Sequence, residues 1–213
     1  GKGKGPFAHS AGDESAGDVA AENAQINNSG KKLLEMIDDI FQIIELESGN
    51  ILPKMRSHNV GELMQDMLDH AIEHREKLNK NNLDIKLEIP PAIRDIAIQT
   101  DQSFLKKIFQ NLIHNALKFT KEGEVVMGCE IIQPNTLQFF ISDTGIGIPP
   151  EKQHLLFKRF RQLDQRQKRE YGGTGLGLYY CKMLIKLLNG EIHAESTKGR
   201  GTTCYFNIHS ELK

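Results

Sequence analysis

The sequence predicts an α/β fold in which helices cover one face of a mixed, mostly antiparallel sheet, forming a two-layer sandwich preceded by a separate bundle or coiled-coil helix. The first observation is hydrophobic periodicity of the helical kind, expected over 20–48, 59–80, 101–118 and 174–189. The second is a set of short apolar runs of strand type, expected over 83–89, 95–100, 124–132, 137–143, 191–196 and 202–209. The third is size, because 213 residues with 38% hydrophobic content and no Trp suit one core plus an appendage. Helices and strands in this order favour a sheet with helices on one face.

The N-terminal quarter divides into a leader, a helix and a linker. Residues 1–19 are rich in Gly, Ala, Ser and Asp, and we expect them to be a disordered leader or an expression remnant. Residues 20–50 carry an apolar seam with the spacing of a coiled coil or bundle, and Gly49 ends it. The seam consists of Ile26, Leu33, Ile37, Ile40 and Ile44. The alternative is an amphipathic helix packed on its own domain. Residues 51–56 are expected to link it to the main domain, residues 57–213.

The helix expected over 101–118 has one polar face. Asn111, Asn115 and Lys118 stand at i, i+4 and i+7, so they share that face, while apolar residues repeat on another. An amide oxygen can ligate Mg²⁺ and a lysine supplies a mobile positive charge, so this face suits a phosphate chain with a hard cation. A solvated helix face is the alternative.

Two glycine-rich segments follow the helix. Asp143 ends an apolar strand and precedes Gly145 and Gly147, so its carboxylate could accept a hydrogen bond from an exocyclic amine such as that of adenine. An ordinary Asp-Gly turn is the alternative. The segment 172–178 reads Gly-Gly-Thr-Gly-Leu-Gly-Leu and feeds a helix N-terminus, where free N–H groups attract anions. It matches neither a P-loop nor a dinucleotide fingerprint.

In this order and spacing, the three segments resemble the N, G1 and G2 boxes of the ATP-binding domain of two-component sensor histidine kinases. The run Leu156-Phe157-Lys158-Arg159-Phe160 resembles their F box, and the likeness covers about residues 57–213. The related chaperone, mismatch-repair and type II topoisomerase ATPases are less similar. Residues 37–49 look like the second helix of the kinase dimerisation hairpin.

The resemblance implies a Mg-ATP site and a phosphorelay function. It implies that Asn115 is the Mg²⁺ ligand, that Asn111 and Lys118 lie near the phosphates, and that Asp143 binds the adenine amine. The residues that it places around the nucleotide are Asn111, Asn115, Lys118, Phe119, Asp143, Gly145, Gly147, Ile148, Phe160, Gly173, Thr174, Gly175, Leu176, Gly177 and Leu178. It further implies γ-phosphoryl transfer to a histidine, a response regulator receiver domain as partner, a homodimer through residues 20–48, and a cytoplasmic location in a parent protein that can be anchored in the inner membrane.

Two departures from the family pattern bear on catalysis. None of the eight histidines has the acidic neighbour and following Arg and Pro of a phosphoacceptor, so the acceptor is expected to be absent and the fragment not to label itself. Lys107 stands where Gln or Glu is frequent, so no general base is assigned. Two alternatives stay open: a nucleotide-binding regulatory module without turnover, and an ATPase of another class in the superfamily.

Other function classes are disfavoured. Six cations between 158 and 169 suggest nucleic acid, but a net charge of −1 favours a lid over ATP. No apolar run reaches the roughly 20 residues of a membrane span. His70 and His74 have a zinc-compatible i, i+4 spacing, but without a third ligand they are expected to be surface residues. The three cysteines are scattered in apolar contexts, typical of free buried thiols in a reducing compartment.

Overall fold

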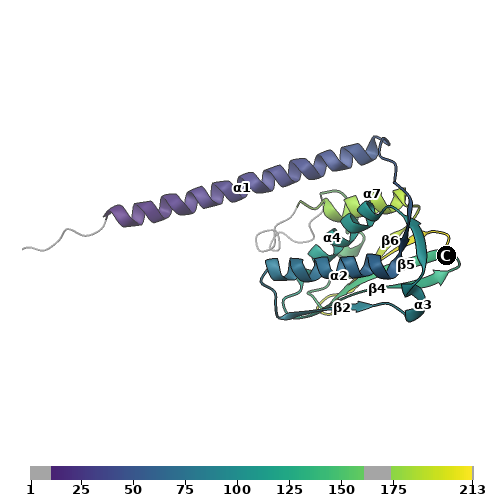
Figure 1. Cartoon of the computed structure of the whole chain (residues 1–213). Coiled ribbons are helices and arrows are strands. Elements are labelled where there is room, and N and C mark those ends of the chain that lie inside the picture. Colours follow the sequence, from purple (N-terminus) through teal and green to yellow (C-terminus); the bar gives the residue numbers. More distant parts are fainter. Residues whose placement is uncertain (1–10, 161–173, 213) are drawn as a thin grey trace, which may run out of the picture.

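The computed structural model describes residues 11–160 and 174–212, and its centre is a five-stranded sheet (Figure 1). The strand order is β2-β4-β5-β7-β6. The strands are β2 (Leu83–Glu88), β4 (Gly123–Gln133), β5 (Thr136–Asp143), β6 (Ile192–Thr197) and β7 (Gly201–His209). Only the β2–β4 pair is parallel, and the other three pairs are antiparallel. The predicted mixed, mostly antiparallel sheet is therefore confirmed.

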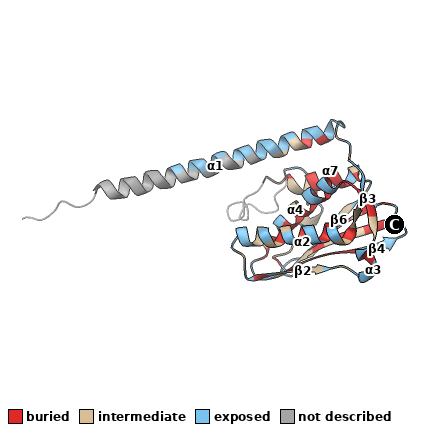
Figure 2. Ribbon diagram, in the orientation of Figure 1, coloured by how far each residue is buried: buried red, intermediate tan, exposed pale blue. Residues whose placement is uncertain are grey.

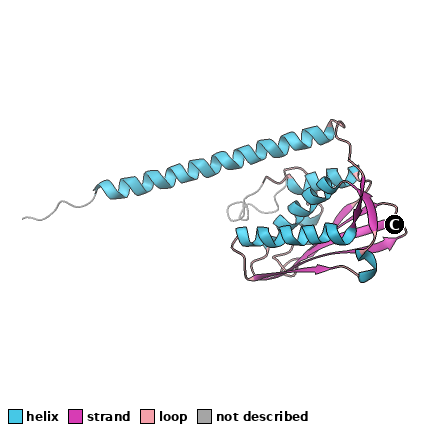
Figure 3. Cartoon of the chain, viewed as in Figure 1, coloured by secondary structure: helices cyan, strands magenta, loops and turns pink. Residues whose placement is uncertain are grey.

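Three helices form the second layer on one face of this sheet: α2 (Val60–Lys77), α4 (Gln102–Phe119) and α7 (Gly177–Leu187) (Figure 3). The core fills the space between the layers (Figure 2). At its centre, the Phe109 ring meets the Phe139 and Phe206 rings edge-on, with centroids 5.6 and 5.4 Å apart. The alternation along β5, where Leu137, Phe139 and Ile141 are buried, explains why one face of the sheet carries the helices.

Helix α4 has a buried polar cap at its N-terminus. The Asp101 carboxylate accepts hydrogen bonds from the backbone N–H groups of Ser103 at 2.8 Å and Phe104 at 3.2 Å. It also accepts the N–H of Lys54 at 2.7 Å. Burial opposes ionisation of Asp101, but a hydrogen bond from the Ser103 hydroxyl, together with these backbone hydrogen bonds, outweighs it and lowers the pKa of Asp101 below the usual value. The cap therefore fixes both the start of α4 and the segment that leads into the domain.

Three short features differ from the sequence expectations. Strand β1 (Arg56–Asn59), whose Arg56 was expected in the linker, pairs antiparallel with β3 (Ala97–Thr100) as a separate two-stranded sheet. Two single-turn helices, α3 (Pro91–Arg94) and α5 (Pro150–Gln153), were not expected, and each begins at the second of two consecutive prolines. The two helices start at proline because proline favours the first helical position. Strand β1 forms because β3, from a distant part of the sequence, pairs with it.

Helix α1 (Ala11–Glu47) is longer than predicted and projects beyond the domain (Figure 1). It begins at Ala11, whereas the helix was expected from residue 20; residues 1–10 lie outside the described part. The seam residues are exposed, from 38% for Ile40 to 67% for Ile26. Only Ile43 and Leu46 are buried among the described side chains of α1, so the helix packs on the domain through its last turns alone.

Candidate functional site

The polar face of α4 lies beside the start of α7. The Nδ2 group of Asn111 donates to the Lys107 carbonyl at 3.0 Å, which holds the side chain against its own helix. Asn115 is half-buried, and within the described residues its amide has no hydrogen-bond partner. The Lys118 ammonium lies 5.3 Å from the Phe119 ring centroid, and burial lowers its pKa. The face thus presents one uncommitted amide and one partly desolvated cation.

Asp143 ends β5 within reach of two backbone donors. Its Oδ1 atom accepts the N–H of Gly145 at 2.9 Å. Burial raises the pKa of Asp143 to about 6, against the opposing effect of hydrogen bonds from the Gly145 and Thr202 backbone. The carboxyl group is therefore held in one orientation and easily gains or loses its proton near neutral pH.

The turn after Asp143 is packed too tightly for larger residues. A Cβ on Gly145 would lie 2.6 Å from the Phe119 carbonyl and 2.7 Å from the Asp143 carboxylate. Gly147 has a φ of +61°, and a Cβ there would lie 2.0 Å from the Thr197 carbonyl. The Ile148 N–H donates to Ser196 Oγ at 2.8 Å. Only glycine fits these two positions, and the turn ties the end of α4 to the β6–β7 hairpin.

The third predicted segment leads into α7, whose first residue lies against the polar face of α4. A Cβ on Gly177, at the start of α7, would lie 2.5 Å from Asn111 Oδ1, so this glycine allows α7 to approach the polar face of α4. Thr174 Oγ1 accepts the Leu176 N–H at 3.2 Å and donates to Asp39 of α1 at 2.7 Å. Gly175 has a φ of +73°. The second and third segments thus approach α4 at different points, Gly145 at Phe119 and Gly177 at Asn111.

Some predicted residues are not placed at this region. Leu176 is 1% exposed and Leu178 packs against the core, so their side chains contribute packing and only their backbone can face a ligand. Phe160 is 64% exposed with a φ of +56°. Gly173 and four of the six cations predicted to form a lid lie outside the described residues. Of the other two, Arg159 contacts α1 and α7: it donates to Glu47 and, at 2.7 Å, to the Tyr179 hydroxyl.

Several residues that complete the site had no clear sequence signal. Thr202 supplies a backbone donor to Asp143 because the two residues are register partners in the β5–β7 pair. Gly201 has a φ of +104°, and a Cβ there would lie 1.8 Å from the Asp143 carbonyl. Gln153 Nε2 donates to the Ile148 carbonyl at 3.0 Å and the Ser196 carbonyl at 2.7 Å. Among these residues, only Gly201, at the start of the last strand, could have been singled out from the sequence, because glycine often marks a special backbone conformation.

Two other chemistries have no support at the site. The Lys107 ammonium donates to the Tyr180 hydroxyl at 3.0 Å, so it bridges α4 and α7 and is no general base. Burial raises the pKa of Cys129 and of Cys204 to about 12, which keeps both thiols protonated and poor nucleophiles. The expectation of free, buried thiols is confirmed for Cys129 and Cys181, whereas Cys204 is partly exposed.

Comparison with known proteins agrees with this geometry. Residues 100–212 match the family described as histidine kinase-, DNA gyrase B-, and HSP90-like ATPase. The chain is 36% identical over 178 residues to the circadian input-output histidine kinase CikA of Synechococcus elongatus, covering 84% of this chain and 23% of that protein. It is 35% identical over 188 residues to the sensor histidine kinase AruS of Pseudomonas aeruginosa, covering 86% of this chain and 18% of that one. The chain thus spans less than a quarter of either relative.

Solved structures support the fold. Full-length ShkA in complex with AMPPNP has a TM-score of 0.77 at 22% identity, covering 91% of this chain and 39% of that chain. The catalytic domain of histidine kinase ThkA has a TM-score of 0.61 at 24% identity, covering 73% and 95%. Across the described residues, no helix has the length and apolar character needed to cross a membrane. The chain belongs to the family of histidine kinase-, DNA gyrase B- and HSP90-like ATPases, and its domain is of the type found in sensor histidine kinases.

Proposed function

We propose that this chain binds Mg-ATP and transfers the γ-phosphoryl group to a histidine imidazole on a dimerisation helix, as a step in two-component phosphorelay. The observation that carries the proposal is Asp143, a partly buried carboxylate held by the Gly145 N–H at 2.9 Å. It lies next to the end of the α4 polar face, because Gly145 and Ile146 both contact the Phe119 carbonyl.

The base is recognised by the direction of hydrogen bonding. An ionised Asp143 is an acceptor only, so it pairs with the exocyclic amine of adenine and repels the carbonyl that guanine carries at the same position. The phosphates are proposed to run toward Asn111, Lys118 and the N-terminus of α7, where the ammonium and free N–H groups face them.

Asn115 fits a Mg²⁺ ligand by its chemistry and its environment. Its amide oxygen is the kind of hard donor that Mg²⁺ accepts, and no described residue competes for it. When bound, the ion would offset charge on the phosphates. One protein ligand is usual for Mg²⁺, which keeps several waters and takes the rest of its ligands from phosphate.

The transfer itself asks little covalent chemistry of the protein. The bond between the γ-phosphorus and its bridging oxygen breaks, a phosphorus–nitrogen bond forms with the imidazole lone pair, and ADP leaves with the electron pair. The role of these residues is to position and to offset charge. The proposal also includes an acceptor histidine and a receiver domain that takes the phosphoryl group next. It further includes the pairing of two chains through the α1 seam and a cytoplasmic location in a parent protein that can be membrane-anchored.

Calorimetry on Asp143→Asn tests the base assignment. Loss of a hydrogen bond to a charged group costs about 1.5–3 kcal/mol, so ATP affinity should fall about ten- to a hundredfold. The wild-type chain should bind ATP more tightly than GTP, and the variant should lose most of that preference. Equal affinity of the wild type for ATP and GTP would remove Asp143 from the base site.

A further inference from the structure

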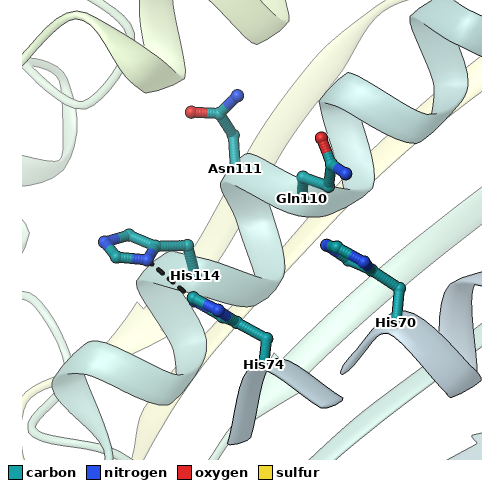
Figure 4. Close-up of a pocket in the computed structure, with 5 residues that line it drawn as sticks. All are labelled: His70, His74, Gln110, Asn111 and His114. Carbon is teal, nitrogen blue, oxygen red and sulfur yellow. Dashed lines mark hydrogen bonds between the residues drawn. The ribbon is translucent and has the colours of Figure 1, made fainter. Parts of the chain in front are cut away.

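Three histidines line a hollow between α2 and α4, beside the proposed nucleotide site. His70 and His74 come from α2, and Gln110, Asn111 and His114 come from α4 (Figure 4). The hollow has a volume of about 220 Å³. The i, i+4 pair on α2 lacked a third partner in the sequence, and the fold supplies one from a position 40 residues away.

We propose that this cluster is a binding site for a first-row transition-metal ion of the Zn²⁺ class, separate from the Mg²⁺ of the nucleotide. The His74 Nε2 and His114 Nδ1 atoms are 3.0 Å apart and hydrogen-bonded to each other. Zn–N bonds of about 2.0–2.1 Å at tetrahedral angles place two ligand nitrogens about 3.3–3.4 Å apart. The distance between the two nitrogens therefore has to grow by only a few tenths of an ångström, and both rings have to turn so that their lone pairs point at the ion.

His70 is the third ligand in this proposal. Its ring is parallel to that of His74, with an interplanar angle of 3° and centroids 6.4 Å apart. As the side chains stand, no group of three or more His, Cys, Asp or Glu within residues 11–160 and 174–212 already converges on one point. Completing the site requires the His70 ring to turn toward the other two. A side chain on a half-exposed helix face can make that change of rotamer.

Binding of the ion to the two imidazoles needs no added acid or base. The two rings now share one hydrogen, donated by one nitrogen to the other. When the ion replaces that hydrogen, the donor ring shifts to its other tautomer, so each neutral imidazole keeps one N–H. The ion exchanges water ligands for imidazole nitrogens, and no net proton is released.

The surroundings select the class of ion. Imidazole is a good ligand for Zn²⁺, Ni²⁺ and Cu²⁺, whereas Mg²⁺ and Ca²⁺ prefer oxygen donors. Lys118 lies on the same helix as His114 and opposes a second positive charge. Glu73 of α2 is exposed and already paired with Lys77 at 2.7 Å, so it does not compete as a ligand in the hollow.

Zn²⁺ titration of the full chain, free of nucleotide and Mg²⁺ and with its thiols reduced, tests the proposal. A competing colorimetric indicator should report one Zn²⁺ per wild-type chain, which millimolar Mg²⁺ does not displace. Changing even an outer-shell partner of a metal typically costs 10–100-fold in affinity, so His74→Gln and His114→Gln should each weaken binding at least about tenfold. Glutamine retains a hydrogen-bonding group, which preserves the contact between the helices.

His154→Ala is the matched control, because His154 is exposed at the end of α5 and should leave Zn²⁺ affinity unchanged. Nitrogen-15 NMR of the wild-type histidines gives a readout that needs no variant: the His74 and His114 ring signals should shift on adding Zn²⁺, followed by His70. Absence of a Zn²⁺ equivalent in the wild type overturns the proposal. Unchanged affinity in both glutamine variants does so too, and points to the cysteines or the N-terminal segment.

Discussion

At the residue scale, the candidate site contains two polar groups that differ in their hydrogen bonding. The Asp143 carboxylate is already oriented by the Gly145 N–H, whereas the Asn115 amide has no partner in the described residues. In the proposed function, the first accepts a hydrogen bond from a base and the second ligates a cation. Both roles can be tested separately, since the two residues lie on different elements.

The pKa of Asp143 predicts a pH dependence of nucleotide binding. In the free chain burial raises this pKa to about 6, and only the ionised carboxylate accepts the adenine amine. ATP binding must then lower the pKa, so affinity should be constant above about pH 6 and fall as pH drops below it, by up to about tenfold per unit. Calorimetry between pH 5 and 8 would measure this. Asp143→Asn, in which only ATP itself titrates, should show a flatter profile; parallel profiles would contradict the prediction.

Asn115 predicts a metal dependence. If its amide ligates Mg²⁺, Asn115→Ala should reduce the enhancement of ATP affinity by Mg²⁺ about tenfold or more, the value of one interaction with a charged group. Titrating ATP with and without Mg²⁺ measures the ratio. Gln102→Ala removes an exposed amide from the other end of α4 and serves as control. An unchanged ratio in Asn115→Ala would place the metal elsewhere.

At the element scale, α4 and α7 carry much of the candidate site, and the C-terminal end of α1 packs beside it. The end of α1 buries Ile43 and Leu46, while Glu47 accepts hydrogen bonds from Arg159 and Tyr179 at the surface. Asp39 accepts the Thr174 hydroxyl from the predicted G2 segment. The helix is thus attached to the two segments that flank the undescribed residues 161–173.

Packing should dominate this attachment. Leu46 is 4% exposed, and replacing a buried Leu by Ala costs about 2–5 kcal/mol, whereas an exposed ion pair contributes about 0.2–1 kcal/mol. Leu46→Ala should therefore increase hydrogen exchange in the last turns of α1 far more than Glu47→Gln does. Leu34→Ala, at an exposed position of the same helix, is the control. A larger effect from Glu47→Gln would show that the polar contacts hold the helix.

At the scale of the whole molecule, the chain corresponds to a small part of the relatives that it matches. It spans 23% of CikA and 18% of AruS, and its seam helix exposes Ile26, Leu33 and Ile44 to solvent. Such an apolar seam is of the kind that pairs with another helix. Under the proposed function, transfer to histidine would depend on an acceptor and a pairing helix that the described residues do not supply.

The isolated chain should not label itself on histidine. None of its eight histidines is followed directly by an acidic residue with Arg and Pro close behind, as in a family acceptor. Phosphoryl transfer also depends on near-attack positioning, which a loosely placed imidazole lacks. Incubation with γ-labelled ATP should leave no acid-labile, base-stable phosphate, whereas an acceptor hairpin added in trans should become labelled. Stoichiometric label on His9, lost in His9→Ala, would contradict this. An unlabelled hairpin despite ATP binding would favour a regulatory module.

The sequence alone determined the sandwich and its main helices and strands, and it singled out the three segments of the candidate site. These features are local: the polar face of α4 follows from a spacing of i, i+4 and i+7, and Asp143 is marked by the end of an alternating strand. The glycines of the turn were readable because a positive φ or a close backbone approach excludes larger residues, as at Gly147.

Only the tertiary structure decided which distant residues meet. The β1–β3 pair, the Thr202 donor to Asp143, and the contact of Gly177 with Asn111 each join parts of the chain that share no local pattern. His114 gave no sign in the sequence that it would meet His74 of α2. Hydrophobic periodicity records which face of an element is buried, but the partner of that face is chosen by packing of the whole core, so such contacts appear only once the layers are assembled.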